Sequence, residues 1–542
     1  MSRREALVSA AIVFGVALGV RIWAAGQVVF PQPEDTAYYV AVARNLLEGR
    51  GLVADALWSY QTEPLSFPRP AFEVWLPLPT ILAALPMAIL GTTFKAAQLS
   101  AVIAGAIVPV LAWRLGADVA IERGLSPGRV RMLALGIGLT AAFYLPLVLF
   151  SALPDSTMPF AVLALGACLV MTRAARRAET QPLDVRWLVA LGVLIGLAAL
   201  TRNEAVWLGL VWLVIVWRTP GMTLRKGIRL VGTVGVVAAV VFAPWAVRNW
   251  LTFGSPLPGQ AAANAFSVTG FDIFAWNDPP TLSRYLAVGP ARLAEMRLEG
   301  LWHNLYTVLL APGSPVAALG LLALAWQVRE RALRPLVLLA ALTFAVTSLA
   351  FPVATTWGTF LHAAGPVHVL LVVSCLGALD AAIARAGIIR GWTRPVAWLG
   401  AAFGVAASAL FAVSFMPATG AQSAAAQEQY AAIERRMAEV GEPLGRGTPR
   451  AITNFPIWLA DSTGTEALAL PAEPPDSVLD LARHFGATRL IFIGTAHDEW
   501  PGVLETAAPG AECFEEVPLD VSADDPDAES LEDVRVFRIV CP

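Results

Sequence analysis

Acidic residues at the ends of apolar stretches are the first candidates for chemistry in this sequence. Glu34 and Asp35 follow the first long hydrophobic stretch, and Asp155 lies in a short polar break between two later ones. A carboxylate held just outside a membrane can act as a general base and take a proton from an acceptor group. We therefore expect Asp35 and Asp155 to be catalytic, with Glu34, Tyr39 and Arg44 in supporting positions.

Three cationic side chains are expected at the same face of the membrane. Arg202 lies in a tight turn between two apolar stretches, Arg248 lies in a segment rich in tryptophan, and His362 follows segment 357–361. An arginine fork binds a phosphate through two hydrogen bonds. We expect Arg202, Arg248 and His362 to bind a substrate phosphate. The alternative for Arg202 is a charge that snorkels to the membrane interface, and the alternative for His362 is a structural role.

Acids and cations at one face suit group transfer from a lipid whose leaving group is a phosphate. The base would take a proton from an acceptor hydroxyl or amine. The cations would stabilise the charge that develops on the departing phosphate.

A short amphipathic helix should hold Asp35 at the membrane surface. Apolar residues recur there at spacings of three and four, at Tyr39, Val42, Ala43 and Leu46. This is the period of one helical face, which can rest on a bilayer. Asp35 would stand just before the first turn of a helix over 36–48, where aspartate also acts as a cap. Asp155 has the same alternative role before the helix that follows it.

The composition indicates a membrane protein. Of the 542 residues, 57% are hydrophobic and only 15% are charged, and the mean hydropathy is +0.63. Apolar runs of about 20 residues predict membrane-spanning helices. We predict a polytopic α-helical protein whose eleven spans lie at 6–25, 96–115, 131–152, 157–173, 187–201, 204–217, 229–246, 302–327, 335–352, 363–384 and 395–416.

Basic residues predict which loops face the cytoplasm. Clusters of arginine occur in five loops, at 114–131, 173–186, 218–229, 329–334 and 385–394. The positive-inside rule places them in the cytoplasm. This assignment requires 74–91 to lie on the outer surface, within a first outer loop over 26–95. The chain is then an integral protein of the cell (plasma or inner) membrane, with a cytoplasmic N-terminus and an extracytoplasmic tail. The alternative for 74–91, which contains three prolines, is a kinked span.

The tail, 417–542, has the pattern of a small soluble α/β domain that follows a membrane domain over 1–416. Segments 427–440 and 476–485 are predicted helices, whereas 489–493 and 534–540 are predicted strands. The alanine-rich stretch 418–426 is a predicted linker. Cys513 and Cys541 could pair if the tail is extracytoplasmic, whereas Cys168 and Cys375 lie inside apolar runs and should pack there.

Several segments resemble those of the GT-C glycosyltransferases. Asp35-x-x-x-Tyr39, followed by Ala43-Arg44 and Gly49-Arg50-Gly51, is similar to the first-loop signature of that superfamily. Segments 197–202, 244–254 and 358–362 also resemble the branch with protein O-mannosyltransferases, lipid A aminoarabinose transferases and RgtA/B/C/D-like galacturonosyltransferase-like proteins. The resemblance covers residues 1–416.

The resemblance implies a GT-C fold and an inverting glycosyltransferase. The donor would be a polyprenyl-phosphate-linked sugar, and the acceptor a lipid, glycan or protein. Asp35 occupies the place of the family's first-loop acid, and Asp155 that of its second acid. Many relatives have Asp-Glu where this chain has Asp35-Thr36, with Glu34 in front. A divalent metal ion is therefore left open, and no other cofactor is expected.

Two other functions are alternatives to the enzyme. A transporter or flippase of a lipid-linked sugar should show inverted repeats and ionisable groups near the middle of the membrane. The sequence has no such repeat, and its polar groups gather at one face. A non-catalytic scaffold would not need Asp35 and Asp155 at one cavity. Besides its substrates we expect membrane lipids as partners, and no nucleic acid.

Overall fold

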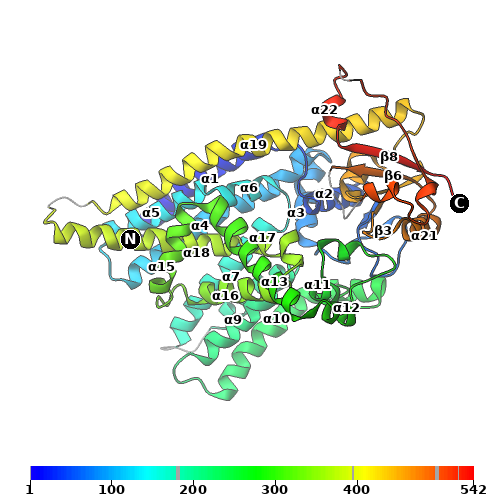
Figure 1. The fold of residues 1–542 in the computed structure, drawn as a ribbon. Helices are drawn as coiled ribbons and strands as arrows, with labels where there is room; N and C mark the ends of the chain where they lie inside the picture. The colour runs from blue at the N-terminus through cyan, green and yellow to red at the C-terminus, as the bar shows by residue number, and fades with distance from the viewer. Residues whose placement is uncertain are drawn as a thin grey trace.

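Long helices and a small mixed sheet occupy opposite ends of the molecule. The computed structural model describes residues 2–178, 184–259, 261–392, 396–494, 500–522 and 524–541. Figure 1 shows a helical bundle at the end that carries the N-terminus, and strands at the end that carries the C-terminus. Helix α19 runs along both ends and connects them.

Among the described residues, six helices are long and apolar enough to cross a membrane. Two bent helix pairs raise this number to eight if each pair forms one span. One pair joins α5 (Pro127–Phe143) to the segment Leu145–Ala152, which contains α6 (Leu145–Leu149), at an angle of 59°. The six long helices are α1 (Arg3–Gln27), α4 (Phe94–Glu122), α7 (Thr157–Ala178), α10 (Leu224–Phe253), α18 (Gly365–Ile389) and α19 (Trp398–Glu439).

Three shorter apolar helices coincide with predicted spans. They are α8 (Val185–Ala199), α9 (Val206–Trp217) and α16 (Arg334–Leu349). Each is shorter than the roughly 20 residues that cross a bilayer without tilt or thinning. All eleven predicted spans thus fall on helical segments, whereas their number as full crossings stays a prediction. Residue 395, where the last predicted span begins, lies outside the described residues.

Besides the predicted span 131–152, which contains the 59° bend, a second predicted span is wrong as a single helix. The chain over 302–327 bends by 118° between Gly313 and Val316. Proline removes a backbone donor and clashes with the preceding turn, so Pro312 and Pro315 account for the break. The segment comprises α13 (Gly289–Trp302), the π-helix η4 (His303–Leu310), α14 (Ala311–Gly313) and α15 (Val316–Gln327).

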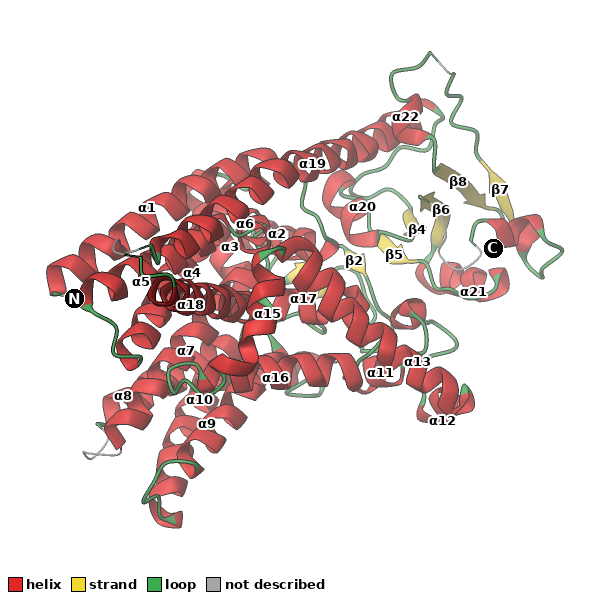
Figure 2. Cartoon of the chain, turned by 60° about the vertical axis from the view of Figure 1, so that its left-hand side comes forward, coloured by secondary structure: helices red, strands yellow, loops and turns green. Residues whose placement is uncertain are grey.

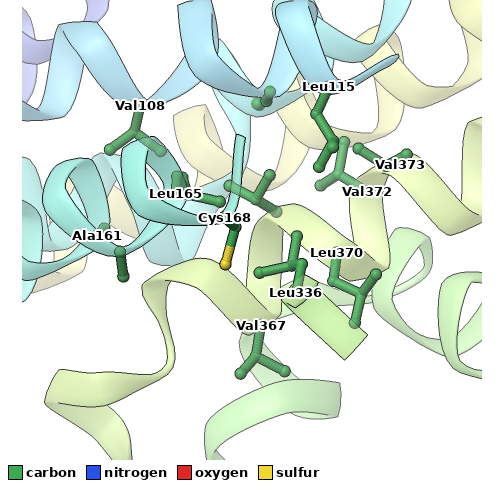
Figure 3. Close-up of a cluster of buried hydrophobic side chains, with 14 of the residues drawn as sticks. Val108, Leu115, Ala161, Leu165, Cys168, Leu336, Val367, Leu370, Val372 and Val373 are labelled. Atoms are coloured by element: carbon green, nitrogen blue, oxygen red, sulfur yellow. The ribbon is translucent and has the colours of Figure 1, made fainter. Parts of the chain in front are cut away.

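The bundle packs through small and branched apolar side chains. Figure 3 shows Leu115 of α4, Leu165 of α7, Leu336 of α16 and Leu370 of α18 in one cluster. Cys168 lies among them, and it is buried as the sequence predicts. This close packing fixes the ends of the helices, where the candidate site lies.

The first outer loop carries α2 (Glu34–Leu47) and α3 (Leu78–Leu90). Two predictions about α2 are wrong. Its apolar face does not lie on the bilayer, because Tyr39, Val42 and Ala43 are buried inside the protein. Asp35 does not precede the helix, because Pro33 holds the cap position and Asp35 lies in the first turn. Proline suits a helix start for two reasons. Its fixed φ angle is compatible with the helix, and the N–H that it lacks would have no partner within the helix there.

The outer end contains a six-stranded sheet in the order β2-β5-β4-β6-β8-β7. Strands β2, β5, β4 and β6 are parallel neighbours, whereas β8 is antiparallel to both β6 and β7. Three helices accompany the sheet (Figure 2): α20 (Pro456–Thr463), α21 (Pro475–Phe485) and α22 (Ala528–Leu531). The strands are β2 (Ala56–Leu57), β4 (Arg450–Thr453), β5 (Ala467–Ala469), β6 (Ala487–Ile493), β7 (Phe514–Glu516) and β8 (Val534–Ile539).

Most predictions for the tail are confirmed. Helix α21 matches the predicted 476–485, and β6 and β8 match the two predicted strands. A disulfide joins Cys513 to Cys541, whose Cα atoms are 5.1 Å apart. The linker prediction for 418–426 is wrong, because α19 continues through it without a break. Alanine has the highest helix propensity, so an alanine-rich stretch beside two helical segments extends them.

The two ends of the molecule share elements. The boundary predicted at residue 416 lies inside α19, and β2 of the first loop pairs with β5 through Ala56 and Ala467. The first loop also forms a two-stranded ribbon of β1 (Val53–Ala54) and β3 (Arg69–Pro70). Folding of 417–542 as an independent domain therefore stays a prediction.

Candidate active site

A cavity of about 620 Å³ lies where the membrane helices meet the first loop and the outer sheet region. Its walls come from α2, the α8–α9 turn, the outer end of α10 and helix α20. Two short elements complete the wall, the 3₁₀ turn η5 (Ala354–Trp357) and α17 (Thr359–Ala363). Asp35, Arg202 and His362 all line this cavity.

His362 lies between the two predicted catalytic acids. Its Nε2 is 3.5 Å from Asp35 Oδ2, and its Nδ1 is 3.2 Å from Asp155 Oδ2. The ring and the Asp155 side chain are buried, whereas the Asp35 side chain is 25% exposed. Among the described residues, Asp35 makes no other hydrogen bond or ion pair. One carboxylate therefore faces the cavity, and the other lies behind the imidazole.

Asp155 combines a cap with a contact to the site. Its Oδ1 accepts a hydrogen bond of 2.8 Å from the N–H of Thr157, the first residue of α7. Thr157 also places its hydroxyl 2.9 Å from His362 Nδ1. The start of α7 therefore fixes both groups that face the inner nitrogen of the imidazole.

The surroundings of His362 favour its charged form. Burial alone would lower the pKa of the imidazole, but the hydrogen-bonding and charge of Asp155, together with the charge of Asp35, outweigh burial and raise it. Gly358 makes room for the ring. Its φ angle is +116°, and a Cβ atom there would lie 3.1 Å from His362 Cδ2. Glycine is the residue that adopts this backbone conformation with little strain.

Arg202 joins three segments of the site. Its Nε and Nη2 donate to the two carboxylate oxygens of Glu204 at 3.1 and 3.0 Å. Its Nη1 donates to Ser156 Oγ at 2.9 Å, and Nη2 donates again to Thr359 O at 3.0 Å. Guanidinium has five N–H groups, so among the described residues one N–H on Nη1 is left. Burial alone would lower the pKa of Arg202, but the charge and hydrogen bonds of Glu204 raise it.

Glu34 and Tyr39 also line the cavity. Burial raises the pKa of Glu34 to about 8, although the N–H of Ile457 donates to its Oε1 at 2.9 Å. Burial raises the pKa of Tyr39, and the charge of Asp35 adds to this effect. The Tyr39 phenol is therefore neutral at physiological pH.

Besides Asp155, which lies behind His362, two predicted residues do not line this cavity. The Arg248 guanidinium lies 4.9 Å from the ring centre of Trp245 and 5.1 Å from that of Phe253. Its neighbour Asn249 lines the cavity instead. Arg44 forms an ion pair of 2.5 Å with Asp461 of α20, in a separate small cavity. The structure thus brings together Asp35, Asp155, Arg202, His362, Glu34 and Tyr39.

Glu73 is a cavity residue that the sequence reasoning missed. It lies in the first loop, lines the cavity and is only 2% exposed. Burial raises the pKa of its carboxyl, while the charge of Arg69 opposes this effect. An acid within the apolar segment 71–76 was the available signal. Trp58 and Trp75 of the same loop also line the cavity and were missed.

Among the described residues, no group of three or more histidine, cysteine, aspartate or glutamate side chains is arranged to hold a metal ion. The imidazole of His362 separates Asp35 from Asp155, so the two carboxylates do not converge on one point.

Known structures with the same architecture have the GT-C fold. No protein-family model matches the sequence, and no curated protein sequence matches it. The archaeal oligosaccharyltransferase AglB from Archaeoglobus fulgidus, in complex with an inhibitory peptide and a dolichol-phosphate, matches with a TM-score of 0.56 and 13% identity. That match covers 96% of this chain and 75% of AglB.

ArnT from Cupriavidus metallidurans matches over nearly the full length of both chains. In its apo state the TM-score is 0.53 at 14% identity, with 98% of this chain and 97% of ArnT covered. Bound to undecaprenyl phosphate, ArnT gives a TM-score of 0.52 at 15% identity, with 98% of each chain covered. This chain therefore has the GT-C fold of a membrane protein, as the first-loop resemblance predicts.

Proposed function

We propose that this protein is an inverting glycosyltransferase that uses a polyprenyl-phosphate-linked sugar on the outer face of the membrane. The observation that carries the proposal is the contact of Asp35 with His362, which is backed by Asp155, at a cavity that also contains Arg202. The GT-C fold supports it, because ArnT binds undecaprenyl phosphate and AglB binds a dolichol-phosphate.

Asp35 serves as the general base in a single displacement. Its exposed carboxylate takes the proton of the acceptor hydroxyl or amine as that group attacks the anomeric carbon. The bond from the anomeric carbon to the phosphate oxygen breaks on the opposite side, which inverts the configuration. Polyprenyl phosphate leaves with the bonding electron pair, and the acceptor retains the sugar.

The cations beside Asp35 act on the leaving group. The raised pKa of His362 favours its charged form, and Arg202 has one guanidinium N–H to offer among the described residues. Both are held by other side chains, so little reorganisation is needed as charge develops on the phosphate. Arg248 contributes more remotely, since it does not line the cavity.

An apolar part of the cavity wall suits the polyprenyl chain. Val206 of α9, Phe242 of α10 and Val346 of α16 line it. Val206 is 57% exposed. In the most apolar 18-residue stretch of α10, only 11% of the residues are buried by the rest of the protein. A lipid tail that follows these helices would bring its phosphate to the polar centre at Arg202.

The proposed orientation places the site and the tail outside the cytoplasm. The disulfide between Cys513 and Cys541 supports this side, because such bonds persist in oxidising compartments. The arginine-rich loops would then face the cytoplasm, as would the N-terminus. We place the protein in the cell (plasma or inner) membrane, and the acceptor is a lipid, glycan or protein outside it.

The test separates an enzyme from a flippase of the same lipid. Purified full-length protein in proteoliposomes is given undecaprenyl-phosphate donors that carry hexoses, pentoses or uronic acids, with an envelope extract as the acceptor mixture. We expect protein-dependent release of undecaprenyl phosphate and an inverted linkage in the product. Movement of intact donor between the leaflets, without release of undecaprenyl phosphate from any donor, would support the flippase instead.

A further inference from the structure

Glu73 is buried in the cavity wall with one oxygen unpaired. Its Oε1 is 3.6 Å from Arg69 Nε, whereas Oε2 is buried and has no hydrogen-bond partner among the described residues. Arg69 itself is fully buried, and its guanidinium donates to Pro64 O and Thr62 O. A buried acceptor without a partner costs free energy, so its place in a cavity wall points to a bound ligand.

The backbone before Glu73 is held in a strained conformation. Phe72 has a φ angle of +75°, in the left-handed region that bulky residues avoid. Its N–H donates a hydrogen bond of 2.6 Å to the Tyr38 hydroxyl, which holds the strained residue in place. Strain of this kind persists where the surroundings fix it, often at ligand sites. Here the strained residue directly precedes the carboxylate in the cavity wall.

Aromatic rings line the cavity wall beside Glu73. The rings of Trp58 and Trp75 have their centres 4.8 Å apart, and Trp75 lies 4.1 Å from the Tyr38 ring. The Trp58 indole N–H lies beside Glu34 and lowers the pKa of that carboxyl. Phe455, just before α20, and Trp458, within α20, extend this aromatic surface from the outer sheet region.

This combination matches the surface of a sugar. A pyranose ring has an apolar C–H face that packs on an indole, and hydroxyl groups at its edge. The Glu73 carboxylate accepts from hydroxyls, and the indole faces pack on the C–H face. Tryptophan faces alone would also suit a lipid tail, but a lipid tail would leave the Glu73 oxygen unpaired.

The charges of the cavity disfavour an acidic acceptor. Asp35 and Glu73 line it, whereas Arg202, the proposed ligand of the donor phosphate, is already paired with Glu204. An acidic sugar or an acidic peptide would meet this excess of carboxylates. The aromatic wall also lies on outer elements, whereas the apolar lining proposed for the polyprenyl chain comes from α9, α10 and α16.

We propose that Glu73, Trp58 and Trp75 form the acceptor subsite and that the acceptor is a neutral glycan. This inference rests on the proposed function and names its acceptor class. Glu73 accepts hydrogen bonds from two hydroxyls of the glycan, and the indoles pack against its rings. The proton that Asp35 removes comes from a further hydroxyl of the same glycan, which attacks the donor sugar.

Binding and kinetics test the subsite separately. Labelled full-length protein in detergent is applied to an array of neutral glycans, acidic glycans and peptides. Glu73→Gln and Trp58→Leu should each weaken neutral-glycan binding about 10- to 100-fold, the size expected for loss of a charge-assisted hydrogen bond or an aromatic anchor. Glu466→Gln, which removes a carboxylate paired with Arg450 away from the cavity, should leave binding unchanged.

Three outcomes would overturn the inference. They are wild-type binding by both folded variants, preference for acidic glycans, and capture of peptides alone. In transfer assays, Glu73→Gln should raise KM for a bound neutral glycan, whereas Glu466→Gln should leave both KM and hydrolysis of the donor by water unchanged. Neutral-glycan binding that depends on Glu73, without any cleavage of a donor, would keep the subsite and contradict the proposed function.

Discussion

Asp155 illustrates how one side chain serves both structure and chemistry. One carboxylate oxygen caps α7 through Thr157, and the other lies 3.2 Å from His362. The cap and the contact with the site, the two roles that the sequence suggests for Asp155, are thus present together. Asparagine also caps helices well, so Asp155→Asn removes the charge beside the imidazole while keeping the start of α7.

The first prediction concerns pH dependence at this pair. The pKa of His362 is raised in the folded protein. Charged His362 therefore stabilises the fold fully below the unfolded pKa of about 6.5. This stabilisation is lost as the pH rises through the folded pKa. Transfer should fall over the same alkaline range, because the leaving phosphate loses its cation. Asp155→Asn should move that fall about one pH unit lower.

The matched control for this profile is Glu34→Gln. The pKa of Glu34, about 8, falls in the same range and could produce the same alkaline limb. Removal of Glu34 should leave the limb in place if His362 causes it. A profile that Asp155→Asn leaves unchanged and Glu34→Gln shifts would assign the limb to Glu34.

The sequence predicted residue types at the site better than their orientation. Asp35, Asp155, Arg202 and His362 were expected at one face and do meet. The signal was position, because each lies just beyond an apolar stretch. Arg248 has the same signal but packs on aromatic rings outside the cavity. Loop residues such as Glu73 carry no periodicity, so only tertiary packing shows what they face.

At the scale of elements, the short segment 354–363 fixes the position of His362. It contains η5, Gly358 and α17. Gly358 has a left-handed φ angle and connects the end of η5 to the start of α17. Gly358→Ala should destabilise the protein by about 1 kcal/mol or more. It should also lower transfer about tenfold or more, since a small misplacement of a catalytic group is costly.

Gly235→Ala is the control for this substitution. Gly235 lies in α10, and a Cβ atom added there would meet nothing within 4 Å. Thermal unfolding and transfer assays on both variants give the comparison. Equal stability and activity for Gly358→Ala and the control would contradict a positioning role for this turn.

Element types were predictable, whereas breaks and continuations were not. The 3.6-residue period and apolar runs gave the helices of the bundle, and β-branched runs gave β6 and β8. The bend at Pro315 and the continuous α19 both depend on neighbours that local patterns do not contain. Strand β2 is only two residues long, and its pairing with β5 is a long-range contact.

At the scale of the whole molecule, the disulfide holds the C-terminal strand to the preceding loop. Cys513 and Cys541 are 28 residues apart in sequence. Loss of a link of this length should cost about 3 kcal/mol of stability. Cys513→Ser should therefore lower the first thermal transition of the full-length protein, and dithiothreitol should have the same effect on the wild type. Unchanged melting under both conditions would contradict a stabilising bond.

The orientation of the molecule has its own test. In intact cells, an impermeant thiol reagent should label Arg450→Cys and leave Leu125→Cys protected. The two native free cysteines of the described chain, Cys168 and Cys375, are buried and should add little background. Labelling at 125 together with protection at 450 would reverse the proposed topology.

The most direct test of the whole account is the rate of donor cleavage by Asp35→Asn. Pro33 holds the cap position of α2, so the substitution does not remove a cap. Glu48→Gln, at the other end of the same helix and paired with Arg446, is the control. The proteins are compared at equal occupancy by the undecaprenyl-phosphate-linked sugar. We then measure release of undecaprenyl phosphate in the presence of acceptor. We expect a loss of about 10²-fold or more for Asp35→Asn and none for the control. Near-normal release by folded Asp35→Asn would contradict it.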